Sequence, residues 1–133
     1  MKSMNKDWYK KGWTMDIQNM SYEDGSFDVV LDKAALDAVI CGDEGMCDPN
    51  KVISEVYRVL KNEGFYICIS YGMPEFRMDY FQNPAQKWKI THISLRKRLF
   101  FIILFVAKEV ISTQSSQAGI EYCHHIYVCR KSE

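Results

Sequence analysis

The sequence predicts a single α/β domain whose mostly parallel sheet ends in an antiparallel hairpin. Phe27–Leu31 and Phe65–Tyr71 are almost continuously apolar and β-prone, as strands buried on both faces would be. Segments with helical spacing of apolar residues separate these two runs, which favours parallel strands joined by helices. Trp88–Ser94 and His125–Arg130 instead alternate in polarity, which is typical of half-exposed strands. This order of segments favours a doubly wound α/β domain.

The composition is that of a globular chain. The 133 residues include 17 Lys+Arg and 17 Asp+Glu, 47% of them are apolar, and the formal net charge is zero. These values argue against disorder and against a polycationic nucleic-acid binder, and they fit one domain spanning residues 1–133. Residues 16–55 are rich in acids, whereas residues 86–98 are basic. Such blocks predict solvated faces, with an acidic face that receives a basic protein substrate as the alternative.

Cysteine usage and hydropathy predict the compartment. The five cysteines are an odd number, none of them forms a CxxC pair, and the first residues are too polar for a signal peptide. A reducing, cytoplasmic setting with free thiols is therefore expected. The longest apolar run, Leu99–Ala107, is nine residues long, whereas a membrane-spanning helix needs about 20. We therefore expect no membrane segment.

Short elements are expected on either side of the first buried strand. Trp13–Ile17 predicts a short extended segment, and the polar loop 18–26 that follows favours a turn through its Glu-Asp-Gly-Ser sequence. Lys33–Cys41 is rich in helix formers with apolar residues on one side, which predicts a short helix. The strand should thus end in a strand-to-helix turn with charged residues at its tip.

A longer helix should precede the second buried strand. Asp48 and Pro49 supply an N-cap and a first-position proline, and the apolar residues that follow keep helical spacing as far as Leu60. Asn62 and Gly64 should mark the end of this helical run. After the second buried strand, residues 76–81 predict a helical turn.

Several stretches of the sequence carry a family pattern. They are FDVVLDKAALDA at 27–38, EVYRVLKNEG at 55–64, Pro74–Arg77, Trp88 with His92, and His125–Tyr127 with Lys131. These stretches resemble class I S-adenosylmethionine-dependent methyltransferases. In particular, they are similar to the elongation factor one-alpha lysine methyltransferase subfamily, the methyltransferase-like enzymes associated with endothelin-converting enzyme. The likeness covers residues 8–97 and 122–131.

The resemblance implies a partial Rossmann-like methyltransferase fold, S-adenosylmethionine as cofactor, and lysine methylation of a protein substrate, elongation factor one-alpha. It implies that Asp16 accepts a hydrogen bond from the adenine amino group and that the backbone of Ile17 meets the adenine ring. Lys33 is implied to pair with the methionine carboxylate at the carboxyl edge of the sheet. Without the resemblance, Asp16 would be an Asx-turn residue and Lys33 a solvated cation.

No catalytic base can be named from the sequence. Tyr71 and Arg77, near the end of the central strand, are the nearest candidates for shaping a substrate mouth. Three charged helix residues are expected to be structural, as surface charges or as an intradomain pair: Asp37, Glu55 and Arg58. The cysteines and histidines at 123–129 are not expected to bind a metal, because strand alternation would point His124 away from the other three and the sequence has no second pair of ligands.

The chain also departs from the family pattern. Lys33-Ala34-Ala35 stands where the family has Lys-Gly-Thr, and Glu63-Gly64 stands where it has two glycines. The sequence contains no GxG turn, whose backbone amides would approach the cofactor, and no acid at the end of a second strand for the ribose. The chain therefore resembles the carboxyl half of the domain. Residues 99–118 predict an insertion, with a buried strand or short helix as the alternative.

These departures lead to expectations about activity and partners. The chain by itself is expected to be inactive, because the glycine turn that would cradle the cofactor is missing. An open sheet edge should lead it to associate with itself or with a complementing amino-terminal half. A non-catalytic binding module is the alternative function. Neither nucleic acid nor a membrane is expected as a partner.

Overall fold

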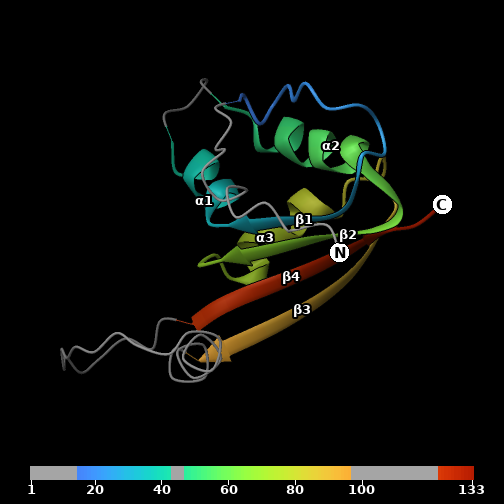
Figure 1. The fold of residues 1–133 in the computed structure, drawn as a ribbon. Helices are drawn as coiled ribbons and strands as arrows, with labels where there is room; N and C mark the ends of the chain where they lie inside the picture. The colour runs from blue at the N-terminus through green and yellow to red at the C-terminus, as the bar shows by residue number, and fades with distance from the viewer. Residues whose placement is uncertain (1–14, 43–46, 97–122) are drawn as a thin grey trace, which may run out of the picture.

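The computed structural model describes residues 15–42, 47–96 and 123–133. In these residues a strand is followed by two helices, a second strand, a third helix and two final strands, and the order strand, helix, helix, strand at the start is the one that the sequence predicts. The elements are β1 (Phe27–Lys33), α1 (Ala35–Ile40), α2 (Pro49–Val59), β2 (Leu60–Ser70), α3 (Pro74–Phe81), β3 (Trp88–Arg96) and β4 (Cys123–Lys131). Figure 1 shows how they are arranged in space.

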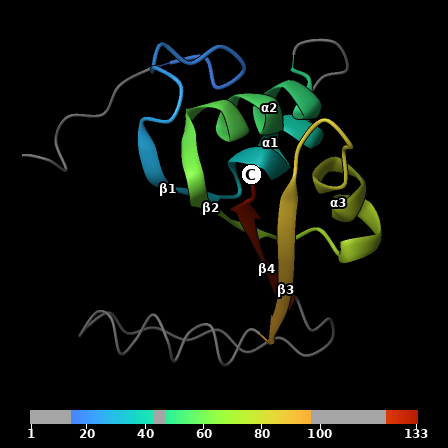
Figure 2. The same cartoon turned by 90° about the vertical axis from the view of Figure 1, so that its right-hand side faces the viewer.

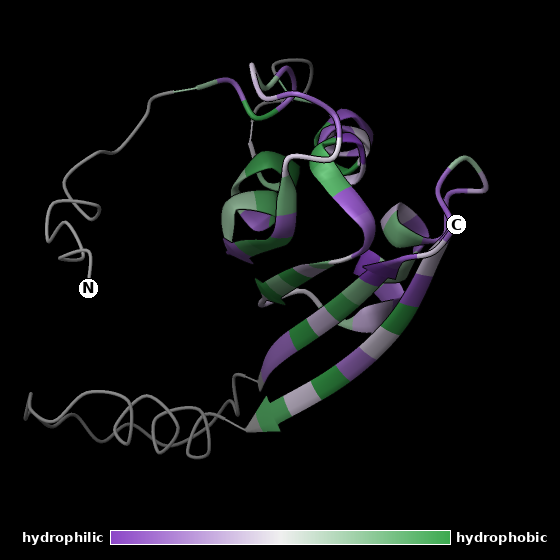
Figure 3. Ribbon diagram, turned by 45° about the vertical axis from the view of Figure 1, so that its right-hand side comes forward, coloured by the Kyte–Doolittle hydropathy of each residue, from purple (hydrophilic) through white to green (hydrophobic). Residues whose placement is uncertain are grey.

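The described strands form one open sheet in the order β1-β2-β4-β3. β1 and β2 are parallel, whereas β4 is antiparallel to both of its neighbours, β2 and β3. β1, β2 and β3 therefore run in the same direction, and the last two strands of the sequence form the predicted antiparallel pair. Polar and apolar residues alternate along β3 and β4, as Figure 3 shows. The predicted fold class, a mostly parallel α/β sheet ending in a hairpin, is confirmed.

The helices pack on one face of the sheet, where the core lies (Figure 2). Buried side chains from all three described helices share a single cluster with the β2 and β4 side chains of that face; the cluster includes Leu36, Val52, Ile53, Val56, Tyr66, Cys68, Phe81, Tyr127 and Cys129. The opposite face exposes large apolar side chains at Val29, Leu31, Phe65 and Ile93. No described helix is long and apolar enough to cross a membrane.

The start of α2 follows the predicted capping. Asp48 Oδ1 accepts a hydrogen bond from the backbone N–H of Asn50 at 2.9 Å, and Pro49 occupies the first helical position. The end of α2 differs from the prediction. β2 begins directly at Leu60, because Leu60 is extended and pairs with Phe27 of β1. Strand pairing therefore ends the helix earlier than its apolar spacing indicates.

The predicted extended segment at 13–17 is not a strand in its described part. Met15 and Asp16 belong to no regular element, and a turn begins at Ile17. The backbone N–H of Asn19 donates to the Asp16 carbonyl at 3.1 Å, and this turn bond replaces the strand pairing that the apolar residues indicated. Trp13 and Thr14 lie outside the described residues.

Candidate functional site

A cavity of about 180 Å³ lies at the carboxyl end of β1, the edge where ligands of open α/β sheets bind. Loop residues Ile17 and Met20 form one wall, and the last residues of β1 form another. Val52 and Val56 of α2 also line the cavity. Its lining is therefore mostly apolar, with charged groups where β1 ends.

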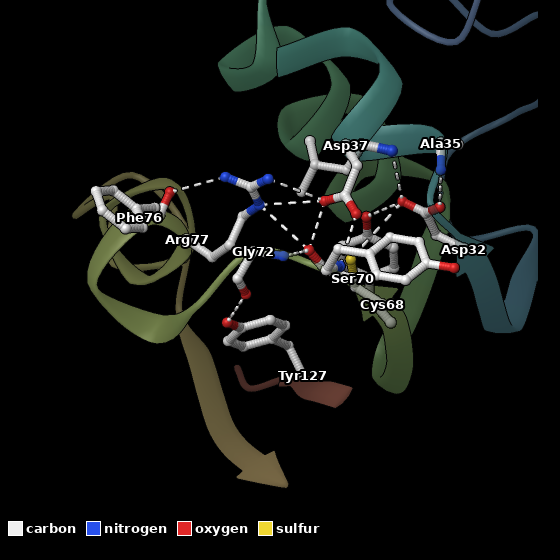
Figure 4. A network of polar contacts seen from close by, with 12 residues as sticks. Asp32, Ala35, Asp37, Cys68, Ser70, Gly72, Phe76, Arg77 and Tyr127 are labelled. Carbon is white, nitrogen blue, oxygen red and sulfur yellow. Dashed lines mark hydrogen bonds and ion pairs between the residues drawn. The ribbon is translucent and has the colours of Figure 1, made fainter. Parts of the chain in front are cut away.

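Asp32 lies one residue before the end of β1, and its carboxylate binds the first residues of α1. One carboxylate oxygen accepts the backbone N–H of Ala35 at 2.7 Å, and the other accepts that of Leu36 at 3.1 Å. The second oxygen also accepts the Tyr66 hydroxyl at 2.8 Å and contacts the Cys68 thiol at 3.8 Å (Figure 4). The carboxylate thus acts as a side-chain cap for α1. The family pattern does not mark Asp32 as a site residue, although its position between a strand and a helix is typical of a cap.

The surroundings of Asp32 keep its hydrogen-bond donors protonated. Burial raises the pKa of Tyr66 well above its ordinary value, and Cys68 and Asp32 raise it further. Burial also raises the pKa of the Cys68 thiol. The thiol is therefore a neutral group and not a thiolate nucleophile at neutral pH.

The structure brings two of the three predicted cofactor-binding residues to this cavity. Ile17 and Lys33 both line it, from the loop before β1 and from the end of β1. Asp16 precedes Ile17 directly, and its Oδ1 accepts the backbone N–H of Gln18 at 2.9 Å. This bond is the Asx-type contact that was the alternative interpretation of Asp16.

Arg58 of α2 holds the loop that forms one wall of the cavity. Its guanidinium donates to the carbonyl oxygens of Met20 and Tyr22 at 2.9 and 2.8 Å. Glu55 accepts from Arg58 at 2.8 Å and from the backbone N–H of Met20 at 2.8 Å. The Arg58 hydrogen bond lowers the pKa of Glu55. The two charged residues form the expected intradomain pair and position the loop.

Asp37 and Arg77 form a second buried network at the end of β2 (Figure 4). Arg77 Nη2 lies 3.1 Å from Asp37 Oδ1, and Arg77 Nε lies 3.2 Å from the Ser70 hydroxyl. Ser70 donates to Asp37 Oδ1, while Asp37 Oδ2 accepts the backbone N–H of Tyr71 at 2.8 Å. Asp37 thus belongs to a buried intradomain ion pair with Arg77 and is not a surface charge. Arg77 is buried in this network, whereas Tyr71 is exposed at the edge.

Gly72 allows the Arg77 side chain to pack against the backbone. A Cβ at position 72 would lie 2.3 Å from Arg77 Cζ, so any other residue would displace the guanidinium. The Gly72 carbonyl accepts the Tyr127 hydroxyl at 2.7 Å, and burial raises the pKa of Tyr127 to about 12. The turn after β2 is therefore held from α1, α3 and β4 at once.

His92 and His125 form a pair on the neighbouring strands. Their Nε2 and Nδ1 atoms lie 2.9 Å apart, and the two rings are stacked at 5.1 Å. Burial and the adjacent His92 lower the pKa of His125. In the described parts of the chain, no group of three or more His, Cys, Asp or Glu residues could hold a metal ion.

With this geometry established, comparison with known proteins identifies the family. Residues 2–68, about half of the chain, match the family described as methyltransferase domain. The chain belongs to the methyltransferase domain family. The class I S-adenosylmethionine-dependent resemblance found in the sequence is thereby confirmed.

Curated relatives have names that agree with the predicted subfamily. The chain is 32% identical over 96 residues to the mouse protein "EEF1A lysine methyltransferase 4". The aligned region covers 66% of this chain and 38% of the mouse protein. It is 34% identical over 87 residues to the cattle protein of the same name, and this alignment covers 59% of this chain and 34% of the cattle protein. The human protein "eEF1A lysine and N-terminal methyltransferase" is 45% identical over 58 residues, which are 42% of this chain and 8% of that protein. The chain thus spans well under half the length of these relatives.

Solved structures support the fold. A methyltransferase from Bacillus halodurans has a TM-score of 0.51 at 13% identity, covering 90% of this chain and 70% of that one. A SAM-dependent methyltransferase from Thermotoga maritima has a TM-score of 0.52 at 18% identity, covering 88% and 61%. These similarities show the Rossmann-like methyltransferase fold for the chain.

Proposed function

We propose that this protein is an S-adenosylmethionine-dependent protein-lysine N-methyltransferase of the kind that acts on eEF1A, in a form that lacks the glycine-rich cofactor turn. One observation carries the proposal: Ile17 and Lys33, two positions that match the family's cofactor-contacting pattern, line the same cavity. The cavity lies at the carboxyl edge of the sheet in a chain of the methyltransferase domain family. The substrate is inferred from the relatives, which are named eEF1A lysine methyltransferases.

The cavity suits one part of the cofactor. Its volume of about 180 Å³ is below the range of about 300–1,000 Å³ that whole ligand pockets occupy. Apolar walls from Ile17, Val52 and Val56 suit a flat aromatic base such as adenine. We therefore assign the adenine ring to this cavity and the polar groups of the cofactor to the open edge beside it.

Three residues are proposed to hold the cofactor. Asp16 accepts a hydrogen bond from the adenine amino group, and the Ile17 backbone contacts the ring. Lys33, exposed where β1 ends, pairs with the methionine carboxylate. When bound, the cofactor supplies an electrophilic methyl group on a sulfonium, which a neutral lysine amine attacks in line. The chain's contribution to this transfer is positioning, and no catalytic base is assigned.

Calorimetric titration with S-adenosylmethionine tests the assignment. Asp16→Ala and Lys33→Ala should each weaken binding by about 1–3 kcal/mol, or about 5- to 150-fold, because each removes a charged partner. Lys51→Ala, which removes an exposed cation from α2, is the matched control and should leave the affinity unchanged. Unchanged affinity in both site variants would contradict the proposal.

We also propose that the β1 edge mediates association. Among the described strands, β1 stands at one end of the sheet, and Val29 and Leu31 are exposed on the face that no described helix covers. An unpaired strand edge offers backbone donors and acceptors to another strand. Sedimentation velocity should show a particle mass that increases with protein concentration, and Val29→Lys should reduce this increase. A monodisperse monomer at all concentrations would contradict this association.

The alternative is a non-catalytic binding module. It would be favoured if the chain bound eEF1A but showed no measurable affinity for S-adenosylmethionine. Assembly with a complementing chain and a cytoplasmic location stay predictions. For the chain by itself we expect weak cofactor binding and negligible methyl transfer, which a radiolabelled-methyl assay on eEF1A measures directly.

A further inference from the structure

Large apolar side chains are exposed on the segment that follows β2. Tyr71, Met73 and Phe76 are 59%, 50% and 63% exposed, and they fall within six consecutive residues. Aromatic residues and methionine are enriched in protein interfaces relative to the rest of the surface. We refer to residues 71–76 as the post-β2 surface.

The exposure of the post-β2 surface is built into the fold. The backbone N–H of Gly72 donates to the Ser70 hydroxyl at 2.9 Å, and the carbonyl of Gly72 accepts the Tyr127 hydroxyl at 2.7 Å. The Phe76 carbonyl accepts from the buried Arg77 guanidinium at 3.2 Å. Figure 4 shows the Phe76 ring pointing away from this network. Because these hydrogen bonds fix the backbone of the surface before a partner binds, binding costs little conformational entropy.

The charges beside the post-β2 surface are acidic. Glu75 and Asp79 are both exposed on α3, four residues apart and so on the same side of the helix. Arg77, the basic residue of α3, is buried against Asp37 and does not offset them at the surface. Like charges at this spacing disfavour the helix. A positively charged partner would relieve their repulsion.

The post-β2 surface also lies at the same sheet edge as the cavity. The backbone N–H of Ala34, directly after Lys33, donates to the Ile69 carbonyl at 2.9 Å. Tyr71 is two residues beyond Ile69, and its N–H binds Asp37 of α1. The turn that carries Lys33 and the post-β2 surface therefore meet at the ends of two adjacent strands.

We propose that the post-β2 surface docks a lysine-bearing, cationic segment of the protein substrate. Apolar side chains of that segment pack against Met73 and Phe76, while its cations face Glu75 and Asp79. The exposed Tyr71 ring offers an additional face for an ammonium group. This inference rests on the proposed function, because it takes the substrate to be a protein methylated on lysine.

Binding of purified eEF1A to the 133-residue chain, measured by biolayer interferometry without cofactor, tests this docking surface. Met73→Ser/Phe76→Ser should weaken binding by about tenfold or more, as loss of interface anchors does. Glu75→Gln/Asp79→Asn should weaken it and reduce its dependence on salt, because exposed charge pairs are screened. The matched controls are Ile93→Ser, an exposed apolar residue on the uncovered sheet face, and Glu23→Gln, an exposed acid before β1.

The outcomes separate the docking surface from the proposed function. Both double variants should bind S-adenosylmethionine as the unaltered chain does and melt at a similar temperature, since the replaced side chains are exposed. If the chain does not bind eEF1A, or if the controls weaken binding as much as the double variants do, the docking surface is wrong. If the chain docks eEF1A through this surface but does not bind S-adenosylmethionine, docking stands and the methyltransferase proposal fails.

Discussion

The guanidinium of Arg77 lies against the carboxylate of Asp37, with Nη2 3.1 Å from Oδ1, and both side chains are buried. The pair joins α1 to α3 across the end of β2, where Ser70 bonds to both residues. A buried charge that loses its partner is strongly destabilising, so each residue depends on the other. Asp37 belongs to the helix that Asp32 of the candidate site caps, and Arg77 directly follows the post-β2 surface in the sequence.

Arg77→Ala should destabilise the domain by about 3–5 kcal/mol, because it leaves the Asp37 carboxylate buried without its cation. Gly72→Ala should cost about 1–3 kcal/mol, because the new Cβ would lie 2.3 Å from Arg77 Cζ. The double variant Gly72→Ala/Arg77→Ala has no guanidinium for the new Cβ to clash with, so its loss of stability should match that of Arg77→Ala alone. Urea unfolding of the three variants measures these differences. Additive costs would show that the Gly72 effect does not act through Arg77.

Ala34→Gly should stabilise the fold by about 1 kcal/mol. Ala34 has φ 63°, in the left-handed region that penalises residues with a Cβ, and it stands where the family has glycine. The matched control is Ala38→Gly, at an exposed position inside α1, which should destabilise by a similar amount. Thermal unfolding of both variants tests this contrast. A loss of stability in Ala34→Gly would mean that the left-handed turn imposes no penalty.

The stability of the domain should fall as the pH drops below about 6.5, the ordinary pKa of an unfolded histidine. Burial and His92 lower the pKa of His125, so the folded protein favours the neutral ring and the unfolded chain binds more protons. This contribution is complete above the unfolded pKa and is lost as the pH falls through the folded pKa.

The groups that act on His125 are His92 of β3, His124 of β4 and Glu75 of α3. Melting temperatures between pH 7.5 and pH 5 measure the effect. His125→Asn should show a shallower fall over this range. Glu55, whose pKa is lowered, loses its contribution only in more acidic solution. An equal slope in both proteins would exclude His125 as the source.

Replacing Leu99–Gln117 by a short glycine-containing turn should preserve the fold and improve solubility. The segment lies outside the described residues, but β3 and β4 pair in register from Trp88 with Lys131 to Arg96 with Cys123. Such a ladder can be closed by a short hairpin connection. A fall in melting temperature of more than about 5 °C, equivalent to about 1 kcal/mol, would show that the segment contributes to the core.

Local patterns in the sequence determined most of the elements. β-branched runs predicted β1 and the main part of β2, and Asp48-Pro49 predicted the start of α2. The two positions where the chain lacks a glycine of the family pattern, Ala34 and Glu63, also adopt the left-handed backbone conformation that favours glycine. Ala34 and Glu63 have φ values of 63° and 65°. These features depend on neighbouring residues along the chain, which the sequence displays directly.

Contacts between distant residues were decided only by the tertiary structure. β4 inserts between β2 and β3, and the described part of the predicted segment 13–17 forms a turn. Arg77, expected at a substrate mouth, is buried against Asp37. Whether a charge is solvated or buried depends on which elements meet over it. The periodicity of one segment does not specify which elements pack together, because strand pairing and core packing depend on residues throughout the chain.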